Sequence, residues 1–278
     1  MKIDAHQHFW HYSDQEYGWI DHTMEKLKKD FLPDDLYPLM KDSGIDGSIT
    51  VQARQKVEET RWLLKLSEQN DFIKGVVGWV DLRHKNLSSQ LEQFNQHPKF
   101  VGVRHVVQDE PDDHFMLGKE FLAGIAELSH YNLVYEILIY HRHLPVAIKF
   151  VERFPEQRFV LDHIGKPNIR DGILDPWREH IQRLAEFPNV YCKISGMITE
   201  TDWHNWKTSD FRPYLDTVFG CFGIQRVLMG SDWPVCTLAG GYNQVFKIVL
   251  NHIKSFSQEE CSMIMGKNAC DVYKITVE

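Results

Sequence analysis

The segment Asp4-Ala5-His6-Gln7-His8 places an aspartate and two histidines at every second position. If the segment is a β-strand, the three side chains share one face, because successive side chains of a strand point to opposite faces. Two neighbouring imidazoles backed by a carboxylate can bind a metal ion or form a paired donor and acceptor site. Two solvated histidines on an N-terminal strand are the alternative interpretation, since short motifs often occur by chance.

A second reactive group is Asp232, which follows an apolar run and precedes Trp233-Pro234. The rigid Trp-Pro exit would fix the direction of the carboxylate, which could then act as a general base on a water molecule. Such a base needs a group that stabilises the electrophile, and the histidines available for this role are His6, His8 and His163. Asp4 could orient one of these imidazoles. A purely structural role for Asp232, in a turn before proline, is the alternative.

Short apolar runs alternate with helical patterns along the whole chain and define the elements that must position these groups. The predicted strands cover Lys2–His8, Gly47–Gln52, Lys74–Val80, Phe100–Val106, Leu133–Tyr140, Arg158–His163, Val190–Ser195 and Arg226–Gly230. The predicted helices cover Val57–Gln69, Lys119–His130, Pro176–Phe187, Phe211–Phe219, Tyr242–Lys254 and Gln258–Tyr273.

Eight strands alternating with helices indicate parallel pairing through right-handed crossovers. This pattern favours a closed (β/α)₈ barrel of the TIM type over an open doubly wound sheet. The 278 residues contain no linker-like or low-complexity tract, so we expect residues 1–278 to form a single domain.

In a (β/α)₈ barrel the C-terminal ends of the strands line the catalytic mouth. Polar side chains follow or end six of the eight predicted strands, and we expect them to converge on one site. The residues concerned are His6, His8, Arg104, His105, His141, His163, Lys193, Ser195 and Asp232. Among them, Arg104 and Lys193 suit a substrate whose carbonyl oxygen gains negative charge, and His141 and Trp233 complete the predicted substrate-binding set.

Composition excludes several other classes of protein. A formal net charge of -8 argues against a general nucleic-acid-binding surface. No apolar run reaches the roughly 18 residues needed to span a bilayer, so we expect no membrane partner. The five cysteines show no C-x-x-C spacing, and the N-terminus lacks the apolar core of a signal peptide. Both features favour reduced thiols and a cytoplasmic location.

Two long connections, Phe9–Pro33 and Gly196–Asp210, stand between the predicted elements. Loops of this length in a compact domain are usually binding loops or lids. They carry several large aromatic side chains, whose faces suit the C–H faces of sugars, although each could equally pack its loop onto the barrel. These are Trp10, Trp19, Trp203 and Trp206.

The opening Asp4–Trp10 resembles the D-x-H-x-H-x-W motif of the amidohydrolase superfamily. Val160–Pro167 resembles the histidine motif of its sixth strand, and Gly230–Pro234 resembles the aspartate motif of its eighth strand. The resemblance extends over the whole chain. It is closest to the amidohydrolase-related branch with sugar lactonases, such as those acting on L-fucono- and L-rhamnonolactone, and segments 199–203 and 210–216 are similar to these members in particular.

This resemblance implies a (β/α)₈ hydrolase that opens a small-molecule sugar lactone to its aldonic acid. It implies that Asp232 activates water and that His6, His8 and His163 polarise the carbonyl or hold a metal. Members with two metal ions have a bridging Lys or Glu on the fourth strand, where this chain has Arg104, a group that cannot bind a cation. We therefore expect no obligatory cofactor, and at most one divalent ion, such as zinc, held by His6, His8 and Asp232.

Two competing functions remain open at this stage. Related barrels decarboxylate aromatic or unsaturated acids, which would require a tightly held metal and a more apolar pocket. A carbohydrate-binding barrel without catalysis would lack the base or the electrophilic group, yet His6, His8, His163 and Asp232 are all present.

Overall fold

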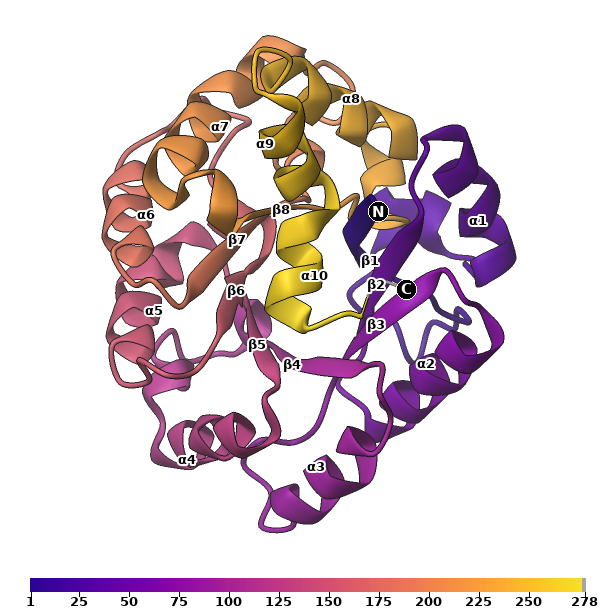
Figure 1. The fold of residues 1–278 in the computed structure, drawn as a ribbon, viewed down its shortest axis with the longest axis vertical. Helices are drawn as coiled ribbons and strands as arrows, with labels where there is room; N and C mark the ends of the chain where they lie inside the picture. Colours follow the sequence, from indigo (N-terminus) through magenta and orange to yellow (C-terminus); the bar gives the residue numbers. More distant parts are fainter. Residues whose placement is uncertain (277–278) are drawn as a thin grey trace.

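Eight parallel strands form the centre of the molecule in the computed structural model, which describes residues 1–276. Each strand pairs with the next along the chain, and the C-terminal ends of β1 and β8 meet through a bridge between Gln7 and Trp233, which closes the barrel. This confirms the predicted (β/α)₈ fold (Figure 1). The strands are β1 (Ile3–Gln7), β2 (Gly47–Val51), β3 (Ile73–Gly78), β4 (Phe100–Val106), β5 (Val134–Leu138), β6 (Phe159–Leu161), β7 (Val190–Ile194) and β8 (Val227–Met229).

Helices surround the strands, as Figure 1 shows. The outer helices are α1 (Pro33–Asp42), α2 (Val57–Gln69), α3 (Leu87–Asn95), α4 (Lys119–Leu128), α5 (Leu144–Val151), α6 (Trp177–Ala185), α7 (Thr208–Phe222) and α8 (Tyr242–His252). They are joined by short 3₁₀ turns, of which four matter for the site. These turns are η1 (His22–Leu27), η6 (Asp162–Gly165), η7 (Ile198–Glu200) and η9 (Val235–Leu238).

The prediction of one continuous helix over Gln258–Tyr273 is wrong. The segment consists of α9 (Gln258–Ser262), a π-helical turn (Met263–Lys267) and α10 (Asn268–Tyr273). The break lies at Gly266, where a Cβ atom would stand 2.2 Å from the carbonyl oxygen of Met1. A glycine is needed there because the chain packs directly against the backbone that leads into β1.

The core has two parts. A large apolar cluster fills the space between the sheet and the helices, and a smaller one lies inside the barrel. In the smaller cluster, Ile3, Val77 and Val160 of the strands pack with Val272 and Tyr273 of α10. Figure 1 shows α10 lying across the centre of the strands. The last described helix therefore closes one end of the barrel and leaves the other end for a site.

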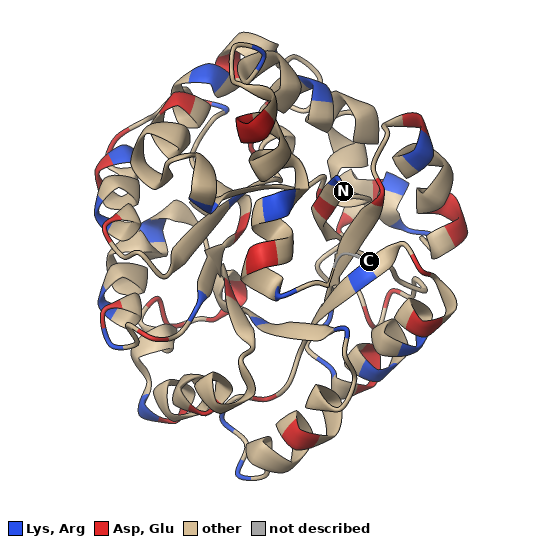
Figure 2. Ribbon diagram, viewed as in Figure 1, with Lys and Arg blue, Asp and Glu red and all other residues tan. Residues whose placement is uncertain are grey.

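Charged residues of both signs are interspersed over the outer helices, and neither sign dominates one side of the view in Figure 2. In residues 1–276, no helix combines the length and the apolar character needed to cross a lipid bilayer.

Candidate active site

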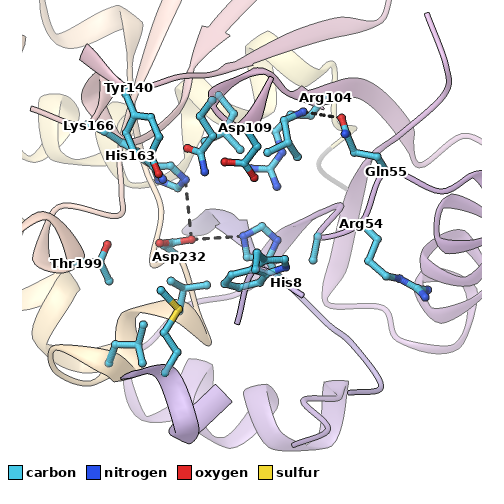
Figure 3. Close-up of a pocket in the computed structure, with 18 of the residues that line it drawn as sticks. His8, Arg54, Gln55, Arg104, Asp109, Tyr140, His163, Lys166, Thr199 and Asp232 are labelled. Atoms are coloured by element: carbon cyan, nitrogen blue, oxygen red, sulfur yellow. Dashed lines mark hydrogen bonds and ion pairs between the residues drawn. The ribbon is translucent and has the colours of Figure 1, made fainter. Parts of the chain in front are cut away.

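Asp232 lies among three histidines at the C-terminal end of the barrel. Its Oδ1 atom is 3.4 Å from Nε2 of His8, 3.8 Å from Nε2 of His6 and 4.0 Å from Nε2 of His163. The two Nε2 atoms of His6 and His8 are 3.2 Å apart. Figure 3 shows Asp232 between His8 and His163, with its carboxylate directed at both. The four side chains expected to converge are thus brought together from three strands.

Backbone pairing fixes this arrangement. The amide of Asp232 donates to the carbonyl oxygen of His6 at 2.8 Å, and the amide of His8 donates to that of Trp233 at 2.7 Å. Asp232 adopts a left-handed conformation with φ of 59°, which a non-glycine residue holds only when its surroundings enforce it. A Cβ atom on Gly230 would lie 2.8 Å from Cβ of His6, so only glycine lets β8 approach β1 this closely.

A second glycine makes room for the ring of His163. Gly196, the second residue after β7, has φ of 61°, and a Cβ there would lie 2.5 Å from Nδ1 of His163. The same Nδ1 is 2.9 Å from the hydroxyl of Ser195. Burial lowers the pKa of His163 to about 4, because a charged imidazole would lose its hydration. The ring is therefore neutral near pH 7.

The tautomer of His8 follows from its partner. Its Nδ1 lies 2.8 Å from the carbonyl oxygen of Val51, which can only accept a hydrogen bond. Nδ1 therefore carries the proton, and neutral His8 presents a lone pair at Nε2 to Asp232. Burial alone would raise the pKa of Asp232, but the imidazoles of His163 and His8 beside its carboxylate outweigh burial and hold this pKa below its usual range.

Beneath the histidines, the barrel interior contains a network of buried charges. Oδ2 of Asp162 lies 3.0 Å from Nη1 of Arg104, and Oδ1 of Asp162 lies 3.3 Å from Nζ of Lys193. Lys193 also contacts Glu136 at 2.6 Å and Nδ1 of His6 at 3.1 Å. Burial would raise the pKa of Asp162, but Lys193, His6 and Arg104 hold it well below its usual range. Such a network fixes its members in place because breaking one pair leaves a buried charge unpaired.

Asp4 does not orient an imidazole, contrary to expectation. Its carboxylate accepts the amide of Ser231 at 2.8 Å and the hydroxyl of Ser231 at 2.6 Å. The pairing of β1 with β2 shifts register between Asp4 and Gln7, so the strict alternation that would put Asp4 on the same face as the two histidines is broken. Asp162, on the turn after β6, lies 3.4 Å from Nδ1 of His6 instead.

A cavity of about 610 Å³ opens above this cluster. His8, His163, Asp232 and Arg104 line it, together with side chains that the sequence analysis did not single out. The additional polar lining residues are Glu16, Arg54, Gln55, Lys56, Gln108, Asp109, Tyr140, Lys166, Thr199 and Glu200. Trp19 and Trp203 of the two long connections also line the cavity, whereas Trp10 is buried and Trp206 donates to the carbonyl of Ala239.

Three predicted substrate-binding residues do not line the cavity. Lys193 is fully buried below His6, in the network with Glu136. Trp233 is 2% exposed and packs edge-to-face against Phe9 and Phe31. His141 uses Nδ1 to contact the carbonyl oxygen of Lys166 at 3.0 Å.

His105 also lies apart from the site, because it faces the helix layer. Its Nε2 is 2.6 Å from Glu110, and its Nδ1 accepts a hydrogen bond from Trp79 at 3.3 Å. The neighbouring Arg104 points into the barrel instead, as the alternation of side chains along β4 requires. A strand-end position therefore identifies only every second residue as a site residue.

The missed residues follow no strand pattern. Asp162 and Lys166 belong to a turn whose conformation is unusual, and Glu200 lies in the connection after β7. Only their position in the sequence could have indicated a role in the site. Asp162 and Lys166 lie in the same motif as His163, Val160–Pro167, and Glu200 lies in segment 199–203.

The donor set of His6, His8 and Asp232 fits one divalent metal ion. Their ligand atoms lie within 4.8 Å of one another. Two ligand atoms of a tetrahedral zinc ion with bonds of about 2.0–2.1 Å are about 3.3 Å apart. The separations of 3.2, 3.4 and 3.8 Å are close to that value. Two cations lie beside this set: Nη1 of Arg104 is 3.3 Å from Nε2 of His6, the ligand atom, and Nζ of Lys193 is 3.1 Å from Nδ1 of the same ring.

The amidohydrolase family model matches residues 3–275. An L-fucono-1,5-lactonase from Burkholderia multivorans is 40% identical over 286 residues, which is 99% of this chain and 96% of that protein. An L-fucono-1,5-lactonase from Burkholderia ambifaria is 34% identical, over 99% of this chain and 96% of that protein.

A crystal structure of an amidohydrolase from Burkholderia multivorans with bound zinc has a TM-score of 0.96 at 40% identity. The match covers 99% of this chain and all of that one. The barrel, its histidines and the aspartate that follows β8 thus accompany sequence similarity over the full length. The chain belongs to the amidohydrolase family.

Proposed function

We propose that the protein hydrolyses a sugar-derived lactone, such as L-fucono- or L-rhamnonolactone, to the aldonic acid. One observation carries the proposal, namely a carboxylate with three imidazole nitrogens within 3.4–4.0 Å, at the base of a polar cavity. Its similarity to two L-fucono-1,5-lactonases supports the substrate class.

In the proposed reaction, Asp232 takes a proton from a water molecule held in the cavity, and the oxygen of that water attacks the lactone carbonyl. The depressed pKa of Asp232 keeps this base ionised at neutral pH. His163 is neutral, and a hydrogen bond from Ser195 to Nδ1 would leave a proton on Nε2 to donate to the carbonyl oxygen. When the ring opens, the proton held by Asp232 passes to the departing ring oxygen.

Arg104 reinforces this arrangement electrostatically. It lines the cavity, and its guanidinium is held by Asp162 and by the side-chain oxygen of Gln52 at 2.9 Å. A fixed positive charge at this place stabilises the oxyanion that forms when water adds to the carbonyl. A metal ion bound by His6, His8 and Asp232 would supply further Lewis-acid polarisation of the carbonyl.

The cavity suits a polyol better than an aromatic acid. Charged and amide side chains make up much of its lining, including Arg54, Gln55, Gln108 and Asp109. These groups can satisfy the hydroxyls of a sugar, whereas a decarboxylase acting on an aromatic ring would gain most from apolar walls.

A panel of L-fucono-, L-rhamnono-, L-galactono- and D-arabinonolactone tests the proposal, with acid release followed by a pH indicator. We expect at least one lactone to open far faster than it does spontaneously. Failure with all four would reject the substrate class. Metal content measured on the same sample, with and without chelator, shows whether the rate follows bound metal.

A further inference from the structure

Two cavity-lining residues of opposite charge, Lys166 and Glu200, have no part in the proposed chemistry. Lys166 directly follows η6, after β6, and Glu200 ends η7, after β7. Because β6 and β7 are neighbours in the barrel, the two turns lie at adjacent positions around the mouth. Both side chains line the same cavity as Asp232 and His163, so all four groups face one ligand-binding space.

The turn that carries Lys166 is strained. Residues 163 to 166 have φ angles of 54°, 49°, 72° and 47°, four left-handed conformations in succession, and only Gly165 among them is a glycine. Each of the others costs about 1–2 kcal/mol relative to an ordinary conformation. Trp177 donates to the carbonyl of Ile164 at 2.7 Å and His141 contacts that of Lys166, which holds the turn in place. Strain of this kind is typical of functional sites.

The ammonium group of Lys166 is free to bind a ligand. It stands 5.2 Å from the ring centroid of Tyr140, and in residues 1–276 no carboxylate oxygen lies within 4.0 Å of it. Figure 3 shows Lys166 and Tyr140 side by side at the cavity, next to His163. The contact with the ring restrains the cation but uses none of its three N–H donors.

The carboxylate of Glu200 is similarly available. The backbone oxygen of Glu200 accepts from the amide of Arg170 at 2.9 Å, but its side-chain oxygens receive no hydrogen bond from any described residue. Burial raises the pKa of Glu200, and the charge of Lys166 opposes this rise. The two groups thus interact electrostatically yet are too far apart for an ion pair. Each group therefore keeps its hydrogen-bonding capacity for a ligand in the cavity.

We propose that Lys166 and Glu200 together recognise a hydroxyl group of the substrate. Lys166 donates a hydrogen bond to the hydroxyl oxygen, and the carboxylate of Glu200 accepts a hydrogen bond from the hydroxyl. A hydroxyl is a donor and an acceptor at once, so a cation and a carboxylate on either side satisfy both functions. The inference rests on the proposed function, since it assigns the pair to the polyol part of the lactone. The pair binds a hydroxyl only at one position and in one configuration, and it therefore determines which sugar lactones the protein accepts.

The experiment compares Lys166→Met, Glu200→Gln and the double variant on L-fuconolactone and on analogues that each lack one hydroxyl. We expect either single substitution to lower kcat/KM for the parent lactone about 10- to 100-fold, the usual loss for a hydrogen bond to a charged group. The double variant should lose little more, because both side chains act on the same hydroxyl. For the one analogue that lacks this hydroxyl, the substitutions should have almost no effect.

Arg170→Gln and Asp202→Asn are matched controls, since they remove the same charges from exposed positions in the same two connections. Both should keep the parental rate, and thermal melting of every variant establishes that it is folded. Equal losses on all analogues, or fully additive losses in the double variant, would overturn the assignment.

A binding measurement separates this inference from the proposed function. L-fucono-1,5-lactam keeps the hydroxyls, carries no charge and resists hydrolysis, so its affinity can be measured by calorimetry even if no lactone is opened. Weaker binding of the lactam to Glu200→Gln and Lys166→Met supports the pair independently of turnover. Unchanged binding to both variants rejects it, whether or not the wild-type protein is a lactonase.

Discussion

His8 and Asp232 face each other across the seam that closes the barrel, with Nε2 of the imidazole 3.4 Å from Oδ1 of the carboxylate. The carbonyl of Val51 holds the proton of His8 on Nδ1, so the nitrogen opposite Asp232 is a lone pair when His8 is neutral. A small polar molecule or a cation between them would have both groups as partners.

Replacing Asp232 with Asn tests its assignment as the base. The amide cannot accept a proton from water, so we expect kcat/KM to fall at least about 100-fold. The substitution preserves shape, and the melting temperature should change little. Lactone hydrolysis by the purified variant is the measurement, and a full rate would rule out the assignment.

The pH dependence of kcat/KM should show no loss of activity on the acid side until about pH 5. The reaction needs ionised Asp232, whose pKa lies below its usual range, and neutral His163, whose pKa is about 4. Both conditions hold above about pH 5, and both fail as the pH falls further. A pH-stat assay measures the profile, and a midpoint near 6.5 would contradict these protonation states.

Metal binding should depend on His8 and be opposed by Arg104. We expect one zinc ion per chain, measured by competition with a chelating indicator, and loss of that ion in His8→Asn. The guanidinium of Arg104 lies 3.3 Å from Nε2 of His6, where it repels a cation and competes for the same lone pair. Arg104→Gln should therefore bind zinc at least about tenfold more tightly. Weaker binding in that variant would argue for a different ion site.

Glu59 should make the protein less stable as the pH rises. It is fully buried, accepts the amides of Ala53 and Arg54, and burial raises its pKa from 4.5 to about 7. Between these values the folded state binds more protons than the unfolded state, so the free energy of unfolding falls with pH.

Glu59→Gln removes this pH dependence of the free energy of unfolding. Chemical denaturation should show that the wild-type protein loses up to about 3 kcal/mol relative to the variant between pH 4.5 and 7.5. Glu58→Gln is the control, because Glu58 is exposed on the same helix. Parallel pH curves for wild type and Glu59→Gln would show that Glu59 ionises normally.

The hydroxyl of Tyr273 should stabilise the charged interior of the barrel. It donates to Glu136, whose pKa burial and the nearby Asp162 raise to about 7 and which also contacts Lys193. Tyr273→Phe removes a buried donor, and we expect a loss of about 1–3 kcal/mol in the free energy of unfolding. Tyr37→Phe, at a position that is 44% exposed, should have almost no effect.

Much of the fold could be predicted because local patterns and tertiary environment agree. β4 and α2 have the predicted bounds, Phe100–Val106 and Val57–Gln69. Helix α5 was not predicted, because Leu144–Val151 is apolar on nearly all sides and mostly buried, which removes the helical period of apolar and polar residues. Helices α1 and α3 were not predicted either, and α1 contains Pro38, a residue that argues against a helix.

Those site residues that lie at or just after the ends of strands could be predicted from the sequence. His6, His8, His163 and Asp232 converge because parallel strands deliver their C-terminal ends to one mouth. The strand before His163 was expected to reach residue 163 but ends at Leu161, since the chain turns left-handed from His163 onwards. Residues other than glycine rarely adopt left-handed backbone conformations, so the sequence did not indicate this turn. The positions of Asp162 and Lys166 therefore could not be predicted from it.

The closure of the barrel by α10 has a consequence for biosynthesis. Lys193, Glu136 and Asp162 are enclosed only when Tyr273 and its neighbours have docked. These residues leave the ribosome after all eight strands have been made, so the interior of the barrel stays hydrated until α10 docks. Docking of α10 is therefore the step that removes water from this end of the barrel, and it can take place only after the eight strands are available to receive it.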